Sequence, residues 1–468
     1  MASEVFCPSG SELSERRPQT GAESSNSGPG PELYGVARLS VRSALCQRLV
    51  GCGREIPRTS LGRTLWAGRG ARELWEPSWL FAEWARVSLP RAAGCGAGPR
   101  AGLPLRRPGP RGYSAGQIMR VANVMLGRGR GGLEESFVVY HLALRAGGHE
   151  VVSLLDGRAA VRPDVEALGV PVLATRIWSH WDPWTVWQVR RRLRQARPDV
   201  VVCHGNRAGR LVLRAARGRW PVVARLPNYR FRRILGCDGF IAILPDQRDA
   251  LIRAGVEAAR VFHIPSMLPE LPAARRTGPT APPVIVAMGR WVSIKGFDLF
   301  LRALAWLKAR GHLFRGVLAG DGPERPRLLQ LLNTLQLQEQ VELPGWITDR
   351  TAFWRRATLA CVPSWTEAFS RVLLEAMAHE VAVVVTDSEG PRQIVEHERT
   401  GLVVPRGDWQ AMGQALERLL LEGCFRSSLA AAARRKVEQC YTLEATAPQL
   451  SAALETVRAR HLARGIPQ

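Results

Sequence analysis

The feature that most constrains the fold is an alternation of short apolar runs with amphipathic stretches, which begins at Met119. The first unit reads VANVML, then a glycine-rich loop GRGRGG, an amphipathic stretch LEESFVVYHLALRAGG and a second apolar run HEVVSLL. Short apolar runs between turn residues are typical of buried strands, and amphipathic stretches that end at glycine are typical of helices. Strands and helices in regular alternation predict a parallel, doubly wound sheet.

The alternation occurs as two series, separated by the Pro/Ala/Gly-rich segment LPAARRTGPTAPP. The first series continues with PDVVVCH, PVVARL and GFIAIL, and the second contains VIVAMG, FRGVLAG, QVELPG, ATLACVP and VAVVVTD. We therefore predict two consecutive Rossmann-like α/β domains. Their expected bounds are 119–272 and 284–450, with a linker at 273–283 and a C-terminal helix and tail at 451–468.

Residues 1–118 differ from the rest of the chain, because they contain no Asp and no Lys and are rich in Gly, Pro, Arg and Ser. They show no sustained helix or strand period and too little apolar surface to offset chain entropy. We expect this segment to be disordered. A second hypothesis is that translation starts at Met119, which intact-mass measurement of the natively expressed protein tests.

The formal net charge of +24 invites a nucleic-acid interpretation, since clustered cations attract polyanions. However, only three of the 65 basic residues are lysines, and such a skew indicates GC-rich coding DNA. The arginines of 1–118 lack interleaved aromatics, and no helix-turn-helix, zinc or RNA-binding signature follows. A basic nucleic-acid-binding protein is therefore the disfavoured alternative, and we expect no nucleic-acid partner.

The nine cysteines form no CxxC pair and no zinc-ligand spacing with histidine, so we expect reduced thiols and no metal site. No apolar run reaches the length of a membrane span, and no uninterrupted signal-peptide core is present. These features predict a cytoplasmic protein.

The first segment with candidate functional residues is GRWVSIKGFD, which follows a predicted strand and carries Arg290 and Lys295. Loops at the carboxyl ends of parallel strands face the ligand crevice, so both cations could meet a diphosphate there. Two solvated surface cations are the alternative. Lysine is rare in this chain, which favours a specific need for a compact ammonium at residue 295.

The second segment is LAGDGPE, a strand that runs into Gly320, Asp321 and Gly322. Glycines at this place allow a tight turn and the close approach of a nucleotide to the backbone. An ordinary strand-to-helix turn is the alternative.

The third segment is PSWTEAFSRVLLEAMA, which places Glu367 before a helix and Glu375 two turns inside it. Residues eight apart lie on similar sides of a helix, so both carboxylates could border one cavity. We expect the helix start to offer free N–H groups from Phe369, Ser370 and Arg371 to an anion. For one such glutamate, a capping or ion-pair role is the alternative.

Taken as an ordered set, these segments resemble the family-4 retaining glycosyltransferases, which have the GT-B architecture. The resemblance covers about 119–450, is densest in 284–408 and includes SEGPRQIVEHERTGLVVPRGD. It implies two domains that face a central cleft and a sugar transferred, with retention, from a nucleoside-diphosphate sugar to a hydroxyl. It also implies no cofactor and no metal ion, because fixed cations neutralise the leaving diphosphate.

The resemblance also implies roles for individual residues. Arg290 and Lys295 would hold the diphosphate, Glu375 the ribose hydroxyls, and Glu367 the donor sugar near its reacting carbon. In the first domain, Gly131 and Gly132 match the glycine-rich loop that closes over the phosphates.

The segment 389–395 would line the sugar pocket through Gly390 and neighbouring backbone. The chain departs from the family pattern at Ser370, where relatives usually have glycine, and at Gln393, where they usually have glutamate. In the first domain, the segment VARLPNY lacks the histidine that usually follows this strand in the family. These departures leave the identities of the acceptor and of the sugar open. His204 and Asn206, at a strand end in VVCHGNRAG, are the acceptor-side candidates, against a purely structural histidine.

The segment RIWSHWDPWTVWQVRRRLRQARPD combines four tryptophans with a basic cluster. Asp182 and Pro183 predict a helix start, and Val186, Val189 and Leu193 predict its core face. A solvent-facing stripe of indole and guanidinium groups suits an anionic bilayer surface, and packing beneath another segment is the alternative. The residues of this stripe are Trp184, Trp187, Arg191 and Arg194.

We therefore expect a lipid-linked, lipopolysaccharide-type or other envelope glycan acceptor, reached by peripheral association with the inner face of the cytoplasmic membrane. The nearest alternatives are other GT-B enzymes, namely a sugar-nucleotide 2-epimerase or a storage-sugar synthase. Epimerisation needs no acceptor, so labelled donor alone distinguishes the first of these. A catalytically inactive relative is disfavoured because Lys295 and Glu367 are both present.

Overall fold

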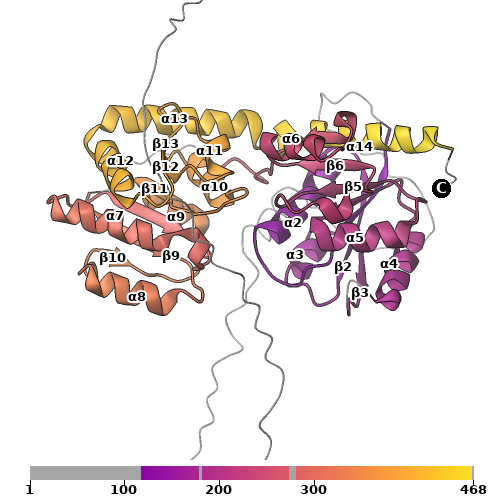
Figure 1. Cartoon of the computed structure of the whole chain (residues 1–468), viewed down its shortest axis with the longest axis horizontal. Helices are drawn as coiled ribbons and strands as arrows, with labels where there is room; N and C mark the ends of the chain where they lie inside the picture. The colour runs from indigo at the N-terminus through magenta and orange to yellow at the C-terminus, as the bar shows by residue number, and fades with distance from the viewer. Residues whose placement is uncertain (1–116, 179–181, 274–280, 466–468) are drawn as a thin grey trace, which may run out of the picture. The chain divides into compact units, whose positions relative to one another are not determined.

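The structure is a computed structural model that describes residues 117–178, 182–273 and 281–465 (Figure 1). Nearly all of the predicted extension 1–118 and most of the predicted linker 273–283 lie outside these residues. The described chain contains two parallel α/β units, so the predicted fold class of two Rossmann-like domains is confirmed.

The first unit is a seven-stranded sheet in the order β3-β2-β1-β4-β5-β6-β7, with parallel pairing between neighbours. Its strands are β1 (Arg120–Met125), β2 (Glu150–Asp156), β3 (Val172–Thr175), β4 (Val200–His204), β5 (Val222–Arg225), β6 (Gly239–Ala242) and β7 (Val261–His263). Its helices are α2 (Gly132–Ala146), α3 (Arg162–Ala167), α4 (Pro183–Ala196), α5 (Gly205–Ala216) and α6 (Pro245–Arg253).

Both faces of this sheet are buried, which is why its strands read as continuous apolar runs. Val121 and Val202 belong to the core beneath α2 and α3, whereas Ala122 and Val201 belong to the core beneath α4 and α5. Successive strand residues point to opposite faces, so each apolar run supplies two cores.

The second unit is a six-stranded sheet in the order β10-β9-β8-β11-β12-β13, again with parallel pairing. Its strands are β8 (Val284–Met288), β9 (Arg315–Ala319), β10 (Val341–Glu342), β11 (Leu359–Val362), β12 (Ala382–Thr386) and β13 (Leu402–Val404). Its helices are α7 (Phe297–Ala309), α8 (Arg325–Thr334), α9 (Arg350–Arg356), α10 (Arg371–Ala378), α11 (Pro391–Ile394), α12 (Trp409–Leu421) and α13 (Gly423–Cys440).

The last helix, α14 (Leu443–Ala463), differs from the expected domain bounds. The boundary expected between residues 450 and 451 falls inside this helix. Its residues Leu450, Leu454 and Val457 are buried in the same core as Val121 and α2, so the helix packs on the first sheet. The contact is close, because a Cβ at Gly239 of β6 would lie 2.6 Å from Cγ2 of Val457.

Candidate active site

The strand order of the second sheet reverses between β8 and β11, which pair with each other. The next strand after β8 is β9, on one side of the pair, and the next strand after β11 is β12, on the other side. Ligands of doubly wound folds bind outside the carboxyl ends of the two strands at such a point. The loop after β8 carries Arg290 and Lys295, and the loop after β11 carries Glu367. The chemical segments predicted from the sequence therefore meet at the expected edge of the sheet.

These two loops touch through their backbones. Gly296 has a φ of 63°, and a Cβ there would lie only 2.1 Å from the carbonyl oxygen of Pro363. The N–H of Trp365 also donates to the carbonyl oxygen of Ile294 at 2.9 Å. Because only glycine fits both this conformation and this contact, Gly296 fixes the spacing of the two loops.

That spacing brings Lys295 and Glu367 together. The Lys295 Nζ forms an ion pair with Oε2 of Glu367, and the Ser364 hydroxyl donates to the same oxygen at 3.4 Å. Glu367 is the more buried partner, with 12% of its side chain exposed against 27% for Lys295. Arg290 is exposed on the same loop, and among the described residues no carboxylate pairs with it. The pair is thus a half-buried charge centre with a second cation on the same loop.

The segment after β12 supports Glu367 from the other side. The N–H of Gly390 donates to the carbonyl oxygen of Glu367 at 2.7 Å, and a Cβ at Gly390 would lie 2.6 Å from the carbonyl oxygen of Ala368. Glu389 approaches the Glu367 N–H at 3.4 Å and pairs with Arg406 at 3.2 Å. Arg406 follows β13 in VVPRGD, and no local pattern distinguished it from other surface arginines.

Gly320 and Gly322 are explained by packing between loops. A Cβ at Gly320 would lie 1.9 Å from the carbonyl oxygen of Gly289, and one at Gly322 would lie 2.4 Å from that of Trp291. Asp321 accepts a hydrogen bond from the Gly322 N–H at 2.8 Å. The ordinary-turn interpretation therefore accounts for both glycines, and a nucleotide contact there stays a prediction.

The start of α10 is capped by a serine side chain. The helix begins at Arg371 with Ser370 as its N-cap, and the Ser370 hydroxyl accepts the Leu373 N–H at 3.3 Å. Phe369 precedes the cap, and its ring packs edge-on against Tyr441. Of the three predicted N–H groups, that of Arg371 lies in the first turn, that of Ser370 is at the cap and that of Phe369 precedes it; their binding of an anion stays a prediction.

Glu375 lies in the second turn of α10, not two turns inside the helix as expected. Its carboxylate accepts hydrogen bonds from Arg350 and, at 3.2 Å, from the indole N–H of Trp354, both on α9. The charge of Glu375 raises the pKa of Arg350 above its usual value. Glu367 and Glu375 thus contact different elements, and the cavity that we expected them to share stays a prediction.

The glycine-rich loop ends at α2, where Gly131 is the N-cap in extended conformation. A Cβ at Gly132 would lie 3.8 Å from Cδ of Arg371, and Arg371 Nε lies 3.1 Å from Oε2 of Glu135. Arg350 lies 3.5 Å from the same residue. Glu135 therefore links α2 to Arg371 and to Arg350, which is a partner of Glu375. Its place in the first turn of a helix did not reveal this role.

His204 lies at the buried end of β4, and its Nε2 forms a 2.8 Å hydrogen bond with Oδ1 of Asn123. Burial, aided by the nearby Arg225, holds the pKa of His204 well below its usual value, so the imidazole is neutral. The side chain of Asn206 donates to the carbonyl oxygen of Arg230. These contacts favour the structural alternative for His204.

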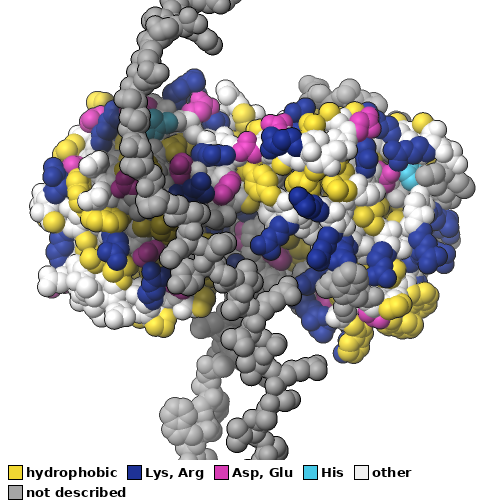
Figure 2. Space-filling model, viewed as in Figure 1, with side chains coloured by type: hydrophobic (Ala, Val, Ile, Leu, Met, Phe, Trp, Pro, Cys, Tyr) yellow, Lys and Arg dark blue, Asp and Glu magenta, His cyan; other side chains and the backbone are white. Residues whose placement is uncertain are grey.

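Helix α4 has the predicted start, since the Asp182 carboxylate accepts the N–H groups of Trp184 and Thr185. Trp184 and Trp187 are 55% and 47% exposed, and their rings stack with centroids 4.6 Å apart. Arg191 and Arg194 are exposed on the same helix, and the Arg191 guanidinium lies 5.6 Å from the Trp187 ring. Over α4, Figure 2 shows hydrophobic side chains beside basic ones.

Two features are absent from the described residues. No helix among them is long and apolar enough to cross a membrane. No three His, Cys, Asp or Glu side chains in this part of the chain gather where they could hold a metal ion.

Comparison with known proteins identifies the family. Residues 131–266 match the family model described as glycosyl transferase 4-like domain, and residues 282–422 match glycosyl transferases group 1. The lipopolysaccharide core biosynthesis glycosyltransferase LpsD of Rhizobium meliloti (strain 1021) is 28% identical over 321 residues, which are 67% of this chain and 91% of LpsD. LpsE of the same strain, also a lipopolysaccharide core biosynthesis glycosyltransferase, is 27% identical over 325 residues, which are 67% of this chain and 92% of LpsE.

A solved structure shows the same fold. The crystal structure of Anabaena Alr3699/HepE in complex with UDP and glucose superposes with a TM-score of 0.63 at 19% identity, covering 72% of this chain and 99% of that chain. Three observations support the same family: both domains match its models, the relatives align over nine-tenths of their length, and the two-domain architecture is shared. The chain therefore belongs to the family-4 glycosyltransferases and has the GT-B fold.

Proposed function

We propose that this glycosyltransferase moves a sugar from a nucleoside-diphosphate sugar to a hydroxyl of a lipopolysaccharide-type or other lipid-linked envelope glycan. The transfer retains configuration at the sugar carbon and uses no metal ion. The observation that carries the proposal is the contact of Lys295 with Glu367 where the strand order of the second sheet reverses.

The chemistry of the reaction explains why these residue types are needed. When the bond between the sugar carbon and the diphosphate breaks, the electron pair leaves with the diphosphate and the sugar becomes cationic. Fixed positive charge beside the diphosphate lowers the energy of that state. We assign this charge to Arg290 and Lys295 in place of a divalent ion, and the Glu367 carboxylate, which pairs with Lys295, would orient that ammonium and contact the sugar.

The donor class has support from a structural relative. HepE, which shares the fold, was crystallised with UDP and glucose. In this chain the Glu375 carboxylate is held in one position by Arg350 and Trp354, and we assign it to the ribose hydroxyls. Gly390 would present backbone groups to the sugar beside Glu367.

The acceptor class follows from the relatives and from the surface of α4. LpsD and LpsE act in lipopolysaccharide core biosynthesis. Trp184, Trp187, Arg191 and Arg194 form an exposed stripe of indole and guanidinium groups, and such groups suit the headgroup layer of an anionic bilayer. We propose peripheral binding to the inner face of the cytoplasmic membrane through this stripe.

The donor is tested by thermal unfolding with UDP-, GDP- and ADP-sugars, because a ligand that binds the folded state raises the melting temperature. We expect one nucleotide class to give the largest rise. Lys295→Ala should lower the rate of nucleoside diphosphate release by about 10²–10³-fold, as the loss of one preorganised charge partner does elsewhere.

Lys308→Ala is the matched control, since Lys308 lies at the opposite end of α7 and contacts Gln336 and Gln340. Its rate should equal that of the wild type. Wild-type turnover by Lys295→Ala, or equal losses in both variants, would contradict the assigned role.

The membrane proposal has a separate test. Vesicles of phosphatidylcholine with one-third phosphatidylglycerol should sediment the protein at low salt, and Trp187→Ala should weaken this binding. Failure of the wild-type protein to sediment would refute peripheral binding and leave the donor chemistry unaffected.

A further inference from the structure

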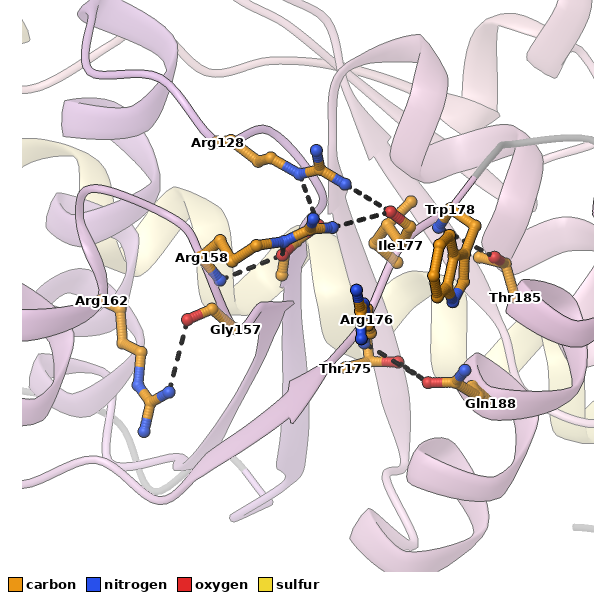
Figure 3. Close-up of polar contacts among 11 residues, drawn as sticks. Arg128, Gly157, Arg158, Arg162, Thr175, Arg176, Ile177, Trp178, Thr185 and Gln188 are labelled. Atoms are coloured by element: carbon orange, nitrogen blue, oxygen red, sulfur yellow. Dashed lines mark hydrogen bonds and ion pairs between the residues drawn. The ribbon is translucent and has the colours of Figure 1, made fainter.

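A basic pocket lies at the edge of the first sheet, between the carboxyl ends of β2 and β3 and the side of α4 (Figure 3). Its volume is about 450 Å³, within the range of small-molecule sites. Arg158, Arg176 and Arg192 contribute to its lining, together with Thr175 and Gln188. None of these residues belongs to the proposed donor site.

The pocket carries an excess of positive charge. Asp156 is fully buried, with Arg128 Nε at 2.8 Å and Arg158 Nε at 3.1 Å. Burial alone raises the pKa of Asp156, but hydrogen bonds from Arg158 and Arg128 bring it below its usual value. The carboxylate is therefore ionised and balances only one of the two guanidinium groups beside it.

The other two arginines lack acidic partners among the described residues. The Arg176 guanidinium lies 4.2 Å from the centroid of the exposed Trp178 ring, and Arg192 donates to Gln195 at 3.0 Å. Figure 3 shows the Arg176 side chain beside Trp178. An anion in the pocket would thus meet several guanidinium groups whose charge is not already neutralised.

The lining is also held in place before any ligand arrives. Arg158 donates to the carbonyl oxygen of Ile177 at 3.0 Å as well as to Asp156. The Gln188 Oε1 accepts from the Thr175 hydroxyl at 2.9 Å and from the Arg176 N–H at 3.3 Å. Because these groups are ordered in advance, binding costs less conformational entropy.

The position of the pocket relates it to the proposed reaction. Arg128 belongs to the glycine-rich loop GRGRGG, and its carbonyl oxygen accepts the Ala160 N–H at 3.1 Å. That loop and the pocket therefore share Asp156 as an anchor. On the other side, Gln188 and Arg192 belong to α4, the helix that carries Trp184 and Trp187.

We propose that this pocket binds a phosphoryl group on a sugar of the glycan acceptor. A phosphate monoester offers three oxygens and about two negative charges, which suits several converging guanidinium groups better than a single carboxylate does. The proposal rests on the proposed function, because it assigns the acceptor side of the same transferase. It makes phosphorylation of the acceptor a determinant of recognition.

The test uses glucose 6-phosphate and glucose as probes, with isothermal titration of the full chain at low salt. Wild-type protein should bind glucose 6-phosphate at least about tenfold more tightly than glucose, and Arg176→Gln combined with Arg192→Gln should remove at least about tenfold of that affinity. Arg253→Gln, which removes an exposed arginine of α6, is the matched control and should bind as the wild type does. Equal affinity of the double variant and the wild type would overturn the proposal.

Two control experiments distinguish phosphate binding in this pocket from binding at the donor site and from binding to a membrane. Lys295→Ala should bind glucose 6-phosphate normally, and a loss there would place the phosphate in the donor site and overturn the proposal. The double variant should keep its thermal stabilisation by the sugar nucleotide, so failure of the pocket is distinguishable from failure of the proposed function.

Vesicles of phosphatidylcholine and phosphatidic acid should bind the double variant as well as they bind the wild type. If the double variant lost vesicle binding but kept glucose 6-phosphate binding, the pocket would be a lipid-headgroup site and the proposal would fall. Equal melting temperatures of the variants exclude unfolding as the cause of any loss.

Discussion

Replacement of Gly296 by alanine should damage catalysis through a shift of one loop, without removing any functional group. Gly296 lies between Lys295 and α7, and its Cβ would fall 2.1 Å from the Pro363 carbonyl oxygen. Real Cβ atoms essentially never approach closer than 3.0 Å, so the loop after β8 must retreat from the loop after β11 by about 1 Å. That movement separates Lys295 from Glu367.

The expected magnitude combines two effects. The left-handed conformation, with a φ of 63°, costs a non-glycine residue about 1–2 kcal/mol of stability. A displacement of about 1 Å in catalytic groups lowers rates by about 10²-fold. We therefore expect Gly296→Ala to lose about two orders of magnitude in nucleoside diphosphate release, and more stability than the backbone term alone.

Gly311→Ala separates the two effects. Gly311 has a φ of 80° at the end of α7, and nothing lies within 4 Å of a Cβ built there. It should lose about 1–2 kcal/mol in urea unfolding and keep the wild-type rate. The assay is release of nucleoside diphosphate from the sugar nucleotide that most raises the melting temperature. A Gly296→Ala rate within twofold of the wild type, or equal loss in both variants, would refute the reasoning.

Three other predictions concern stability, each measured by urea unfolding. Glu375→Gln keeps the shape of the side chain but removes the nearer of the two carboxylates that pair with Arg350, so we expect a loss of about 2 kcal/mol, and an unchanged midpoint would contradict this. Asp182→Ala removes the cap that accepts two N–H groups of α4 and should cost about 1 kcal/mol, whereas a neutral effect would show that the cap is dispensable. Burial lowers the pKa of His141 to about 4, so the unfolded chain takes up its proton first as the pH falls. Stability should therefore decline from about pH 6.5 to pH 4, by roughly 3 kcal/mol, and equal midpoints at pH 7 and pH 5 would count against a buried neutral imidazole.

The sheets could be predicted because their strands are buried on both faces and therefore appear as uninterrupted apolar runs. The edge strands β3, β7 and β13 are only partly buried, so their residues form less clear apolar runs, and they were not recognised. The contact of Lys295 with Glu367 was foreseeable in outline, since both follow strands whose carboxyl ends meet at one edge.

Other contacts of the site depend on tertiary packing that no local pattern encodes. Glu375 was recognised, but its partner Arg350 comes from a helix that only the folded chain places beside α10. Glu135 and Arg406 likewise gain their contacts from neighbours distant in sequence. The serine at position 370 was recognised as a departure from the family. Its role as the helix cap that accepts the Leu373 N–H could not be predicted, because the sequence did not show where the helix begins.

The course of α14 has a consequence for the biosynthesis of the protein. Leu450, Leu454 and Val457 complete the core on one face of the first sheet, although they are translated after every strand of the second sheet. A nascent chain that has already formed β1 to β7 therefore still exposes an apolar sheet face while the whole second sheet is being synthesised. Ribosomes that stall or terminate before residue 443 should release a product that aggregates or is degraded, even though every strand of the first sheet is present.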